Sequence, residues 1–179
     1  KLRDFNSAKK LLLKAAEIEN KNIDILFNLA ECHQSLGEID QAKEYAYKIL
    51  NLQPNHSAIH RFISLIINHN SDKSHLPKII EIENGENFNN YSLNEKTDIY
   101  FALGKAFEDV KDYEKSFNYL EKANSIKNKE TNYNLSAHEK LINSIIKLFD
   151  DFDFEKIKKK ATQKQIVFIC GMPRSGSTL

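Results

Sequence analysis

Cysteines are scarce in this sequence, and no long apolar run occurs in it. The 179 residues include only two cysteines, Cys32 and Cys170, whose different contexts predict no disulfide framework. We therefore expect a reducing compartment, and we predict a cytoplasmic location. The apolar runs are only a few residues long, far short of the ~20 residues that a membrane-spanning helix requires. The sequence thus predicts no membrane segment.

Net charge is also nearly absent, since 26 lysines and arginines balance 25 acidic residues. A formal charge of +1 provides no broad positive field, so we expect no nucleic-acid partner. Apolar residues make up 41% and charged residues 28%, which is typical of a soluble globular protein. Met172 is the only methionine, so residue 1 is not a translation start. We expect an internal part of a longer protein, and a signal peptide upstream of residue 1 stays an open alternative.

A period of 34 residues relates segments in the first third of the chain. Ala8 in DFNSAKKLLLKAA and Ala42 in EIDQAKEYAYKIL occupy matching positions 34 residues apart. This period is typical of tetratricopeptide repeats, each of which is a pair of antiparallel helices. The unit around Ala42 matches the repeat pattern at Leu26, Leu29, Ala30, His33, Ala42 and Pro54, with Gly37 at the turn between its helices.

A later segment, IYFALGKAFEDVKDYEKSFNYLEKA, fits the same pattern better. The matching positions are Tyr100, Leu103, Gly104, Phe107, Ser116, Leu120 and Ala123. Small residues such as Gly104 and Ser116 allow two helices to approach closely, and larger ones fill the space between neighbouring hairpins. The sequence resembles tetratricopeptide repeats over about residues 1–130, which predicts a mainly α fold with an α-solenoid in the region 1–132.

Residues 57–91 are less regular. Ala42 and Ser116 are 74 residues apart, which is two periods plus six, so we expect one degenerate repeat with a short insertion. Its helices are predicted in SAIHRFISLIINHN and in HLPKIIEIEN, with Pro77 in the first turn of the second helix. The stretch NGENFNNYSLN is predicted to be a polar loop.

The character of the chain changes after the repeats. Apolar residues at helical spacing in LSAHEKLINSIIKLFDDF predict a helix that caps the solenoid. This helix and the lysine-rich linker FEKIKKKATQKQ make up the region 133–164. The run IVFIC predicts a strand buried on both faces of a parallel sheet. We therefore expect an α/β domain to begin in the region 165–179.

The last residues, GMPRSGSTL, have the layout of a phosphate-binding loop. Gly171, Gly176 and Thr178 fit the pattern G-x-x-x-x-G-K-[ST]. Ser177 stands where that pattern has the lysine that contacts the outer phosphates of ATP or GTP. Backbone N–H groups at a helix start would still hold an anion, and Arg174 offers a planar fork for phosphate or sulfate. The loop therefore favours an anion other than a nucleoside triphosphate.

The stretch IVFICGMPRSGSTL resembles the 5′-phosphosulfate loop of sulfotransferases, in the G-M-P-R-S-G-T-T-L form of tyrosylprotein sulfotransferase relatives. Ser177 replaces the first threonine of the pair and keeps its hydroxyl. The layout also resembles bacterial proteins in which tetratricopeptide repeats precede a sulfotransferase domain. The resemblance implies that the donor is 3′-phosphoadenosine-5′-phosphosulfate (PAPS), bound without a metal by Arg174, Ser175, Gly176, Ser177 and Thr178.

The same resemblance implies an enzyme that transfers the sulfuryl group of PAPS to an acceptor hydroxyl. Arg174 and the loop hydroxyls would stabilise the charge that develops on the bridging oxygen. The general base and the 3′-phosphate site would lie beyond Leu179, so we expect residues 1–179 alone to be inactive.

Two alternatives stay open at this point. The repeats could form a protein-interaction module beside an incidental loop, or the loop could belong to another P-loop nucleotide-binding enzyme. A cysteine phosphatase is excluded by spacing, because only three residues separate Cys170 from Arg174 where the phosphatase motif has five.

The repeats predict a peptide or protein partner in their groove. The candidate groove residues on first helices are Asp24, Phe27, Glu31, Phe101, Lys105 and Glu108. No paired lysine–asparagine clamp for a terminal carboxylate is visible. His56 and His60 are four residues apart, but no third ligand accompanies them, so we expect surface histidines and no metal site.

Overall fold

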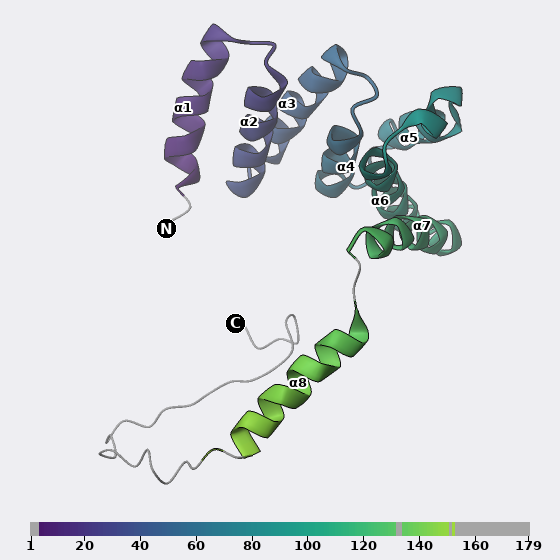
Figure 1. Cartoon of the computed structure of the whole chain (residues 1–179). Helices are drawn as coiled ribbons and strands as arrows, with labels where there is room; N and C mark the ends of the chain where they lie inside the picture. The colour runs from purple at the N-terminus through teal and green to yellow at the C-terminus, as the bar shows by residue number, and fades with distance from the viewer. Residues whose placement is uncertain (1–3, 132–133, 151, 153–179) are drawn as a thin grey trace. The chain divides into compact units, whose positions relative to one another are not determined.

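The computed structural model describes residues 4–131, 134–150 and 152, and all of their regular structure is helical (Figure 1). The chain forms two compact units, residues 1–133 and 134–179, and each is described by itself. The first contains α1 (Phe5–Ile18), α2 (Ile23–Ser35), α3 (Ile39–Leu52), α4 (Ser57–Ile66), α5 (His75–Asn84), the 3₁₀ helix η1 (Glu86–Asn90), α6 (Leu93–Asp109) and α7 (Tyr113–Thr131). The second contains α8 (Leu135–Asp150).

In the first unit, α2 pairs with α3 and α6 pairs with α7 as antiparallel hairpins, whereas α4 and α5 both pack against α6 (Figure 1). The close approach of α6 and α7 depends on the small residues that the sequence placed there. The Ser116 hydroxyl donates a hydrogen bond of 2.8 Å to the Gly104 carbonyl oxygen, across the two helices. In the hairpin α2–α3 the matching residues are Ala30 and Ala42, and both are fully buried.

The turns within the first and last hairpins share one geometry. Each spans three residues, between Ser35 and Ile39 and between Asp109 and Tyr113. The middle residue of each has a left-handed backbone, with φ of 78° at Gly37 and 64° at Lys111. Glycine adopts this conformation without strain, whereas a side chain such as that of lysine costs about 1–2 kcal/mol there.

Two hydrophobic clusters form the core of the first unit. One joins α2, α3 and α4 around Leu26, Ile49, Ile59 and Ile63, and the other joins α5, η1 and α6 around Ile79, Ile99 and Leu103. The repeat register is visible in two equivalent ring stacks. His33 lies against Tyr45 with 5.3 Å between ring centroids, and Phe107 lies against Tyr119 with 5.6 Å.

The predicted degenerate repeat is formed by α4, α5 and η1. Its two helices lie where the sequence predicted them, and Pro77 is in the first turn of α5. The segment NGENFNNYSLN is not simply a polar loop, because it forms η1 and buries Phe88 in the second core cluster. The turn between α4 and α5, residues 67–74, is longer than the three-residue turns of the two hairpins.

The helix predicted after the repeats is present as α8. Its apolar side chains, including Leu141, Ile142, Ile145 and Ile146, are about half exposed within the described part of the chain. Whether α8 caps the solenoid stays a prediction, because the two units are described separately. The strand predicted in IVFIC and the loop that follows it lie outside the described residues.

Candidate functional site

The first helices of the two hairpins, α2 and α6, carry the residues predicted to line a groove. On α2, Asp24 and Glu31 are exposed, whereas Phe27 is partly buried and packs edge-on against Phe62 of α4, with 5.5 Å between ring centroids. Phe27 therefore helps to join α2 to α4 and offers only part of its ring to a ligand.

The three predicted residues on α6 come together in one hollow, which includes none of the three on α2. Phe101, Lys105 and Glu108 line a cavity of about 190 Å³, which we call the α4–α6 hollow. Its other lining residues, which the sequence did not single out, are Arg61, Ser64, Leu65 and Leu120. Three of these four belong to α4 and its end, so the hollow depends on the packing of two successive repeats.

Arg61 is held over one wall of the α4–α6 hollow by two contacts. Its Nη1 atom donates to Asp98 Oδ1 at 2.9 Å, and its guanidinium carbon lies 4.7 Å from the centroid of the Phe101 ring. A guanidinium has five N–H donors, so an ion pair through one nitrogen leaves others for a ligand. Stacking on Phe101 keeps the fork oriented, which favours planar contact with a carboxylate or a peptide carbonyl group.

Ser64 adds an unusual feature to the same hollow. Its side-chain oxygen is fully buried and has no hydrogen-bond partner within the described part of the chain. An unpaired buried hydroxyl costs about 1–3 kcal/mol. A ligand group or a water that reaches this hydroxyl would recover part of that free energy.

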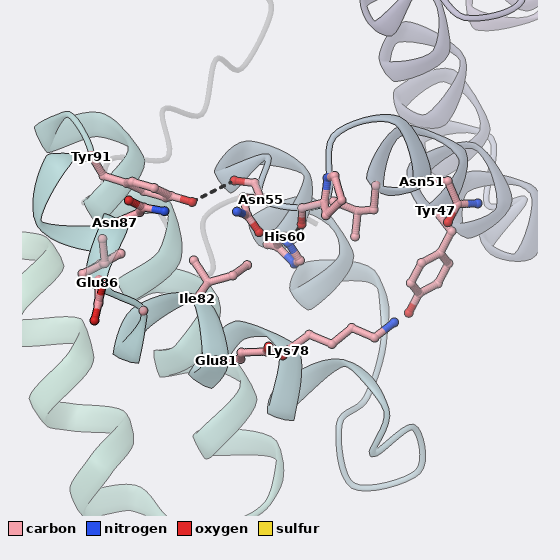
Figure 2. A pocket seen from close by; sticks show the side chains of 14 residues that line it. Tyr47, Asn51, Asn55, His60, Lys78, Glu81, Ile82, Glu86, Asn87 and Tyr91 are labelled. Atoms are coloured by element: carbon pink, nitrogen blue, oxygen red, sulfur yellow. Dashed lines mark hydrogen bonds between the residues drawn. The ribbon is translucent and has the colours of Figure 1, made fainter.

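A second, larger hollow of about 650 Å³ lies between α3, α4, α5 and η1 (Figure 2). We call it the α3–α5 pocket. Tyr47, Lys78 and Tyr91 line it together with several asparagines and glutamates, and the Tyr91 hydroxyl donates to the Asn55 carbonyl oxygen at 3.4 Å. Burial raises the pKa of Tyr47 and of Tyr91, so both phenols stay protonated at neutral pH.

No sequence pattern predicts the α3–α5 pocket. Its walls come from three helices and η1, and only Pro54 among its lining residues belongs to the repeat pattern. The one local clue is Phe88, an aromatic residue in an otherwise polar stretch.

The histidines correct one prediction. His60 is not a surface residue, because its side chain is almost fully buried, while His56 at the start of α4 is partly exposed. His60 contacts the Pro54 carbonyl oxygen at 2.8 Å and His75 at 3.0 Å. Across residues 4–131, 134–150 and 152, no group of three or more histidine, cysteine, aspartate or glutamate side chains has the geometry to hold a metal ion.

The donor-loop residues Arg174, Ser175, Gly176, Ser177 and Thr178 lie outside the described residues, so their predicted role stays a prediction. No helix in the described part of the chain has the length and the apolar composition to cross a membrane.

The family models that match this chain cover the regions of the two helical hairpins. Two tetratricopeptide-repeat models match the chain, one over residues 1–66 and the other over residues 97–130. These residues are tetratricopeptide repeats. The two matched ranges flank the segment that contains α5 and η1, where the structure has its shortened helix and its buried Phe88.

Two similar proteins extend this comparison. An uncharacterized protein of Aquifex aeolicus (strain VF5) is 31% identical over 173 residues, which cover 96% of this chain and 22% of that protein. The chain thus spans about a fifth of the length of this relative. A chain in the crystal structure of MamA is 14% identical with a TM-score of 0.39, covering 73% of this chain and 92% of that chain.

Proposed function

We propose that the tetratricopeptide repeats bind an extended segment of a partner protein on the face formed by α2, α4 and α6. The observation that carries this proposal is the α4–α6 hollow, which combines an aromatic wall, oriented cations and an unpaired hydroxyl. Repeats of this kind stack into extended surfaces that suit a polypeptide better than a small molecule.

The chemistry of the α4–α6 hollow indicates what the segment presents. Phe101 and Leu65 offer apolar contact, and a volume of about 190 Å³ accommodates one side chain. Arg61 lies at the rim with donors to spare, and Lys105 is paired with Asp109 and lies 4.0 Å from Glu108. A segment with one apolar side chain beside a carboxylate therefore fits best.

The test uses the full chain and a phage-displayed library of random linear peptides. We expect selected peptides to share an apolar residue next to an acidic one, and Phe101→Ala to weaken their binding at least about tenfold, a typical loss at an aromatic anchor. Phe117→Ala is the matched control, because Phe117 lies on α7 and is 65% exposed. Equal binding by both variants would refute the proposed face.

A second proposal concerns the terminal loop. We infer that the intact protein transfers a sulfuryl group from PAPS to an acceptor hydroxyl, with Arg174, Ser175, Gly176, Ser177 and Thr178 at the 5′-phosphosulfate. The motif GMPRSGSTL carries this inference.

Calorimetry with adenosine 3′,5′-bisphosphate on the intact protein tests this second proposal. Loss of a bidentate arginine contact to an anion removes a charge-assisted interaction, so we expect Arg174→Ala to weaken binding at least about tenfold. Arg61→Ala is the matched control and should leave this affinity unchanged while it weakens the selected peptides. Equal affinity of both variants for the bisphosphate, or magnesium-dependent hydrolysis of ATP, would refute the sulfotransferase proposal.

A further inference from the structure

Three buried histidines form a continuous chain of polar contacts through the degenerate repeat. The Pro54 carbonyl oxygen lies 2.8 Å from His60 Nε2, and His60 Nδ1 lies 3.0 Å from His75 Nε2. His75 Nδ1 then lies 3.3 Å from His69 Nε2, and His69 Nδ1 lies 3.2 Å from Asp109 Oδ2. We call His60, His75 and His69 the histidine chain; all three are at most 1% exposed.

The histidine chain joins α4, the long turn of this repeat and the start of α5. His60 comes from α4, His75 begins α5, and His69 lies in the long turn, residues 67–74. The backbone N–H of His69 also donates to Asp109 Oδ2 at 3.1 Å, so the turn is anchored to the end of α6. Lys105 binds the other oxygen of the same carboxylate.

A proton count limits what the histidine chain can hold. The chain has four polar contacts and ends on two acceptors, the Pro54 carbonyl and the Asp109 carboxylate. Each contact needs one proton, and three neutral imidazoles supply three protons. One additional proton satisfies all four contacts, whereas a second would place two N–H groups against each other.

The arrangement does not suit a metal ion. The two nitrogens of His75 face two different rings, so the three histidines do not converge on one point. Acidity is the remaining variable to which such a cluster can respond.

We propose that the histidine chain is an acid-sensitive switch, which holds at most one additional proton in the folded repeat and forces the repeat open when more are taken up. The proposal is independent of the peptide-binding and sulfotransferase proposals, because it rests on the core and not on either ligand site.

The surroundings of the histidine chain also disfavour the uptake of protons in the folded repeat. Burial is the largest influence on all three rings and lowers the pKa of His60 and of His69. Burial, together with the positive charge of the neighbouring histidines, lowers the pKa of His75 to about 3. Asp109 opposes this effect at His69 without reversing it. The other charged or titratable groups that face the chain are His56, Lys78, Asp72 and Lys105.

The sign of the effect follows from these lowered pKa values. Unfolded imidazoles have a pKa of about 6.5, so below that pH the unfolded chain binds more protons and acid favours unfolding. As the pH falls from about 7.5 to about 5.5, protonation of each unfolded imidazole shifts the folding equilibrium about tenfold towards the unfolded state. Because the pKa of each folded ring is lowered, the one proton that the folded histidine chain can hold offsets at most one of the three factors, so the folding constant should fall at least about 100-fold.

The test is urea denaturation of the full chain at a series of pH values, with His75→Gln and His56→Gln. A glutamine at position 75 can donate to one ring and accept from the other, so it keeps both contacts and removes one titrating group. Between about pH 7.5 and about pH 5.5, we expect the folding constant of His75→Gln to fall by a factor about ten times smaller than that of the wild type, because one imidazole no longer titrates. We expect His56→Gln to behave like the wild type. A wild-type fall of less than 100-fold, or the same fall in the wild type and His75→Gln, would overturn the proposal.

Nitrogen-detected NMR of the wild-type histidine rings gives a second readout that needs no variant. We expect the three rings together to take up no more than one proton before the protein unfolds. Independent titration of each ring near about pH 6.5 in the folded protein would also overturn the proposal.

Discussion

The contact between α6 and α7 leaves no room for a methyl group at Gly104, and Gly104→Ala tests whether this close approach holds the last hairpin together. A Cβ atom at this position would lie 2.7 Å from Leu120 Cδ2 and 2.8 Å from Leu120 Cγ. Carbon atoms in contact normally lie about 3.5–4.0 Å apart, so Leu120 or the helices must shift. Such overpacking costs about 1–3 kcal/mol, whereas alanine in place of glycine stabilises a helix by about 1 kcal/mol. The expected net result is a loss of about 1 kcal/mol in the free energy of unfolding.

The decisive measurement is the same substitution in a Leu120→Ala background, followed by urea denaturation. Removing the Leu120 side chain removes the obstacle, so only the helix-propensity gain remains. Gly104→Ala should then stabilise the protein by about 1 kcal/mol, a reversal of sign. Gly37→Ala, at a left-handed residue in another hairpin, should cost about 1 kcal/mol in both backgrounds. An equal effect of Gly104→Ala in both backgrounds would refute the packing argument.

Three further substitutions test the local structure of the repeats. Lys111→Gly should stabilise the protein by about 0.5–1 kcal/mol in thermal unfolding, because Lys111 has a left-handed backbone with φ of 64° and glycine adopts this conformation without strain. No gain in stability would show that Lys111 is unstrained. Ser92→Ala removes the capping box of α6 and should cost about 1 kcal/mol in urea denaturation, and a neutral result would contradict the cap. Glu38→Gln should speed amide exchange in α1, because the Glu38 carboxylate is the partner of Lys9 at 2.8 Å. The pKa of Glu38 is lowered, first by its hydrogen bond with Lys9, so the stabilisation from this ion pair is present above about pH 4.5 and is lost as the pH falls. Amide exchange in α1 that changes neither in the variant nor with pH would exclude this stabilisation.

The repeat fold was predictable because its signals are local and periodic. The 34-residue offset identified the hairpins, and small residues such as Gly104 and Ser116 identified the helix contacts. The helices of the degenerate repeat followed from apolar spacing and from Pro77. These features depend on neighbouring residues in one hairpin, which is why the sequence alone reveals them.

The candidate sites were only partly predictable. The sequence identified Phe101 and Lys105 from their place on a first helix, but Arg61 belongs to the preceding, degenerate repeat and had no pattern to mark it. The burial of His60 depends on His75 and His69, which the start of α5 and the long turn bring to it. Contacts of this kind join segments without a shared period, so no local pattern predicts them.

The two parts of the functional account have different foundations. The repeats are established by family models and by the hairpins, and their α4–α6 hollow supports binding of a polypeptide. The sulfotransferase proposal depends on the motif at residues 171–179, with arginine at position 174 and serine in place of the P-loop lysine. The crossed variants Arg61→Ala and Arg174→Ala separate the two, since each should impair one ligand and leave the other unaffected.

The most direct test of the peptide-binding face is an NMR titration of the full chain with a library-selected peptide. The predicted result is a set of shifted backbone amides along α2, α4 and α6, with the largest changes beside Arg61 and Phe101, and no saturable change in the Phe101→Ala variant. Shifts confined to the α3–α5 pocket around Tyr47 and Tyr91, or the same titration curve for Phe101→Ala, would contradict it.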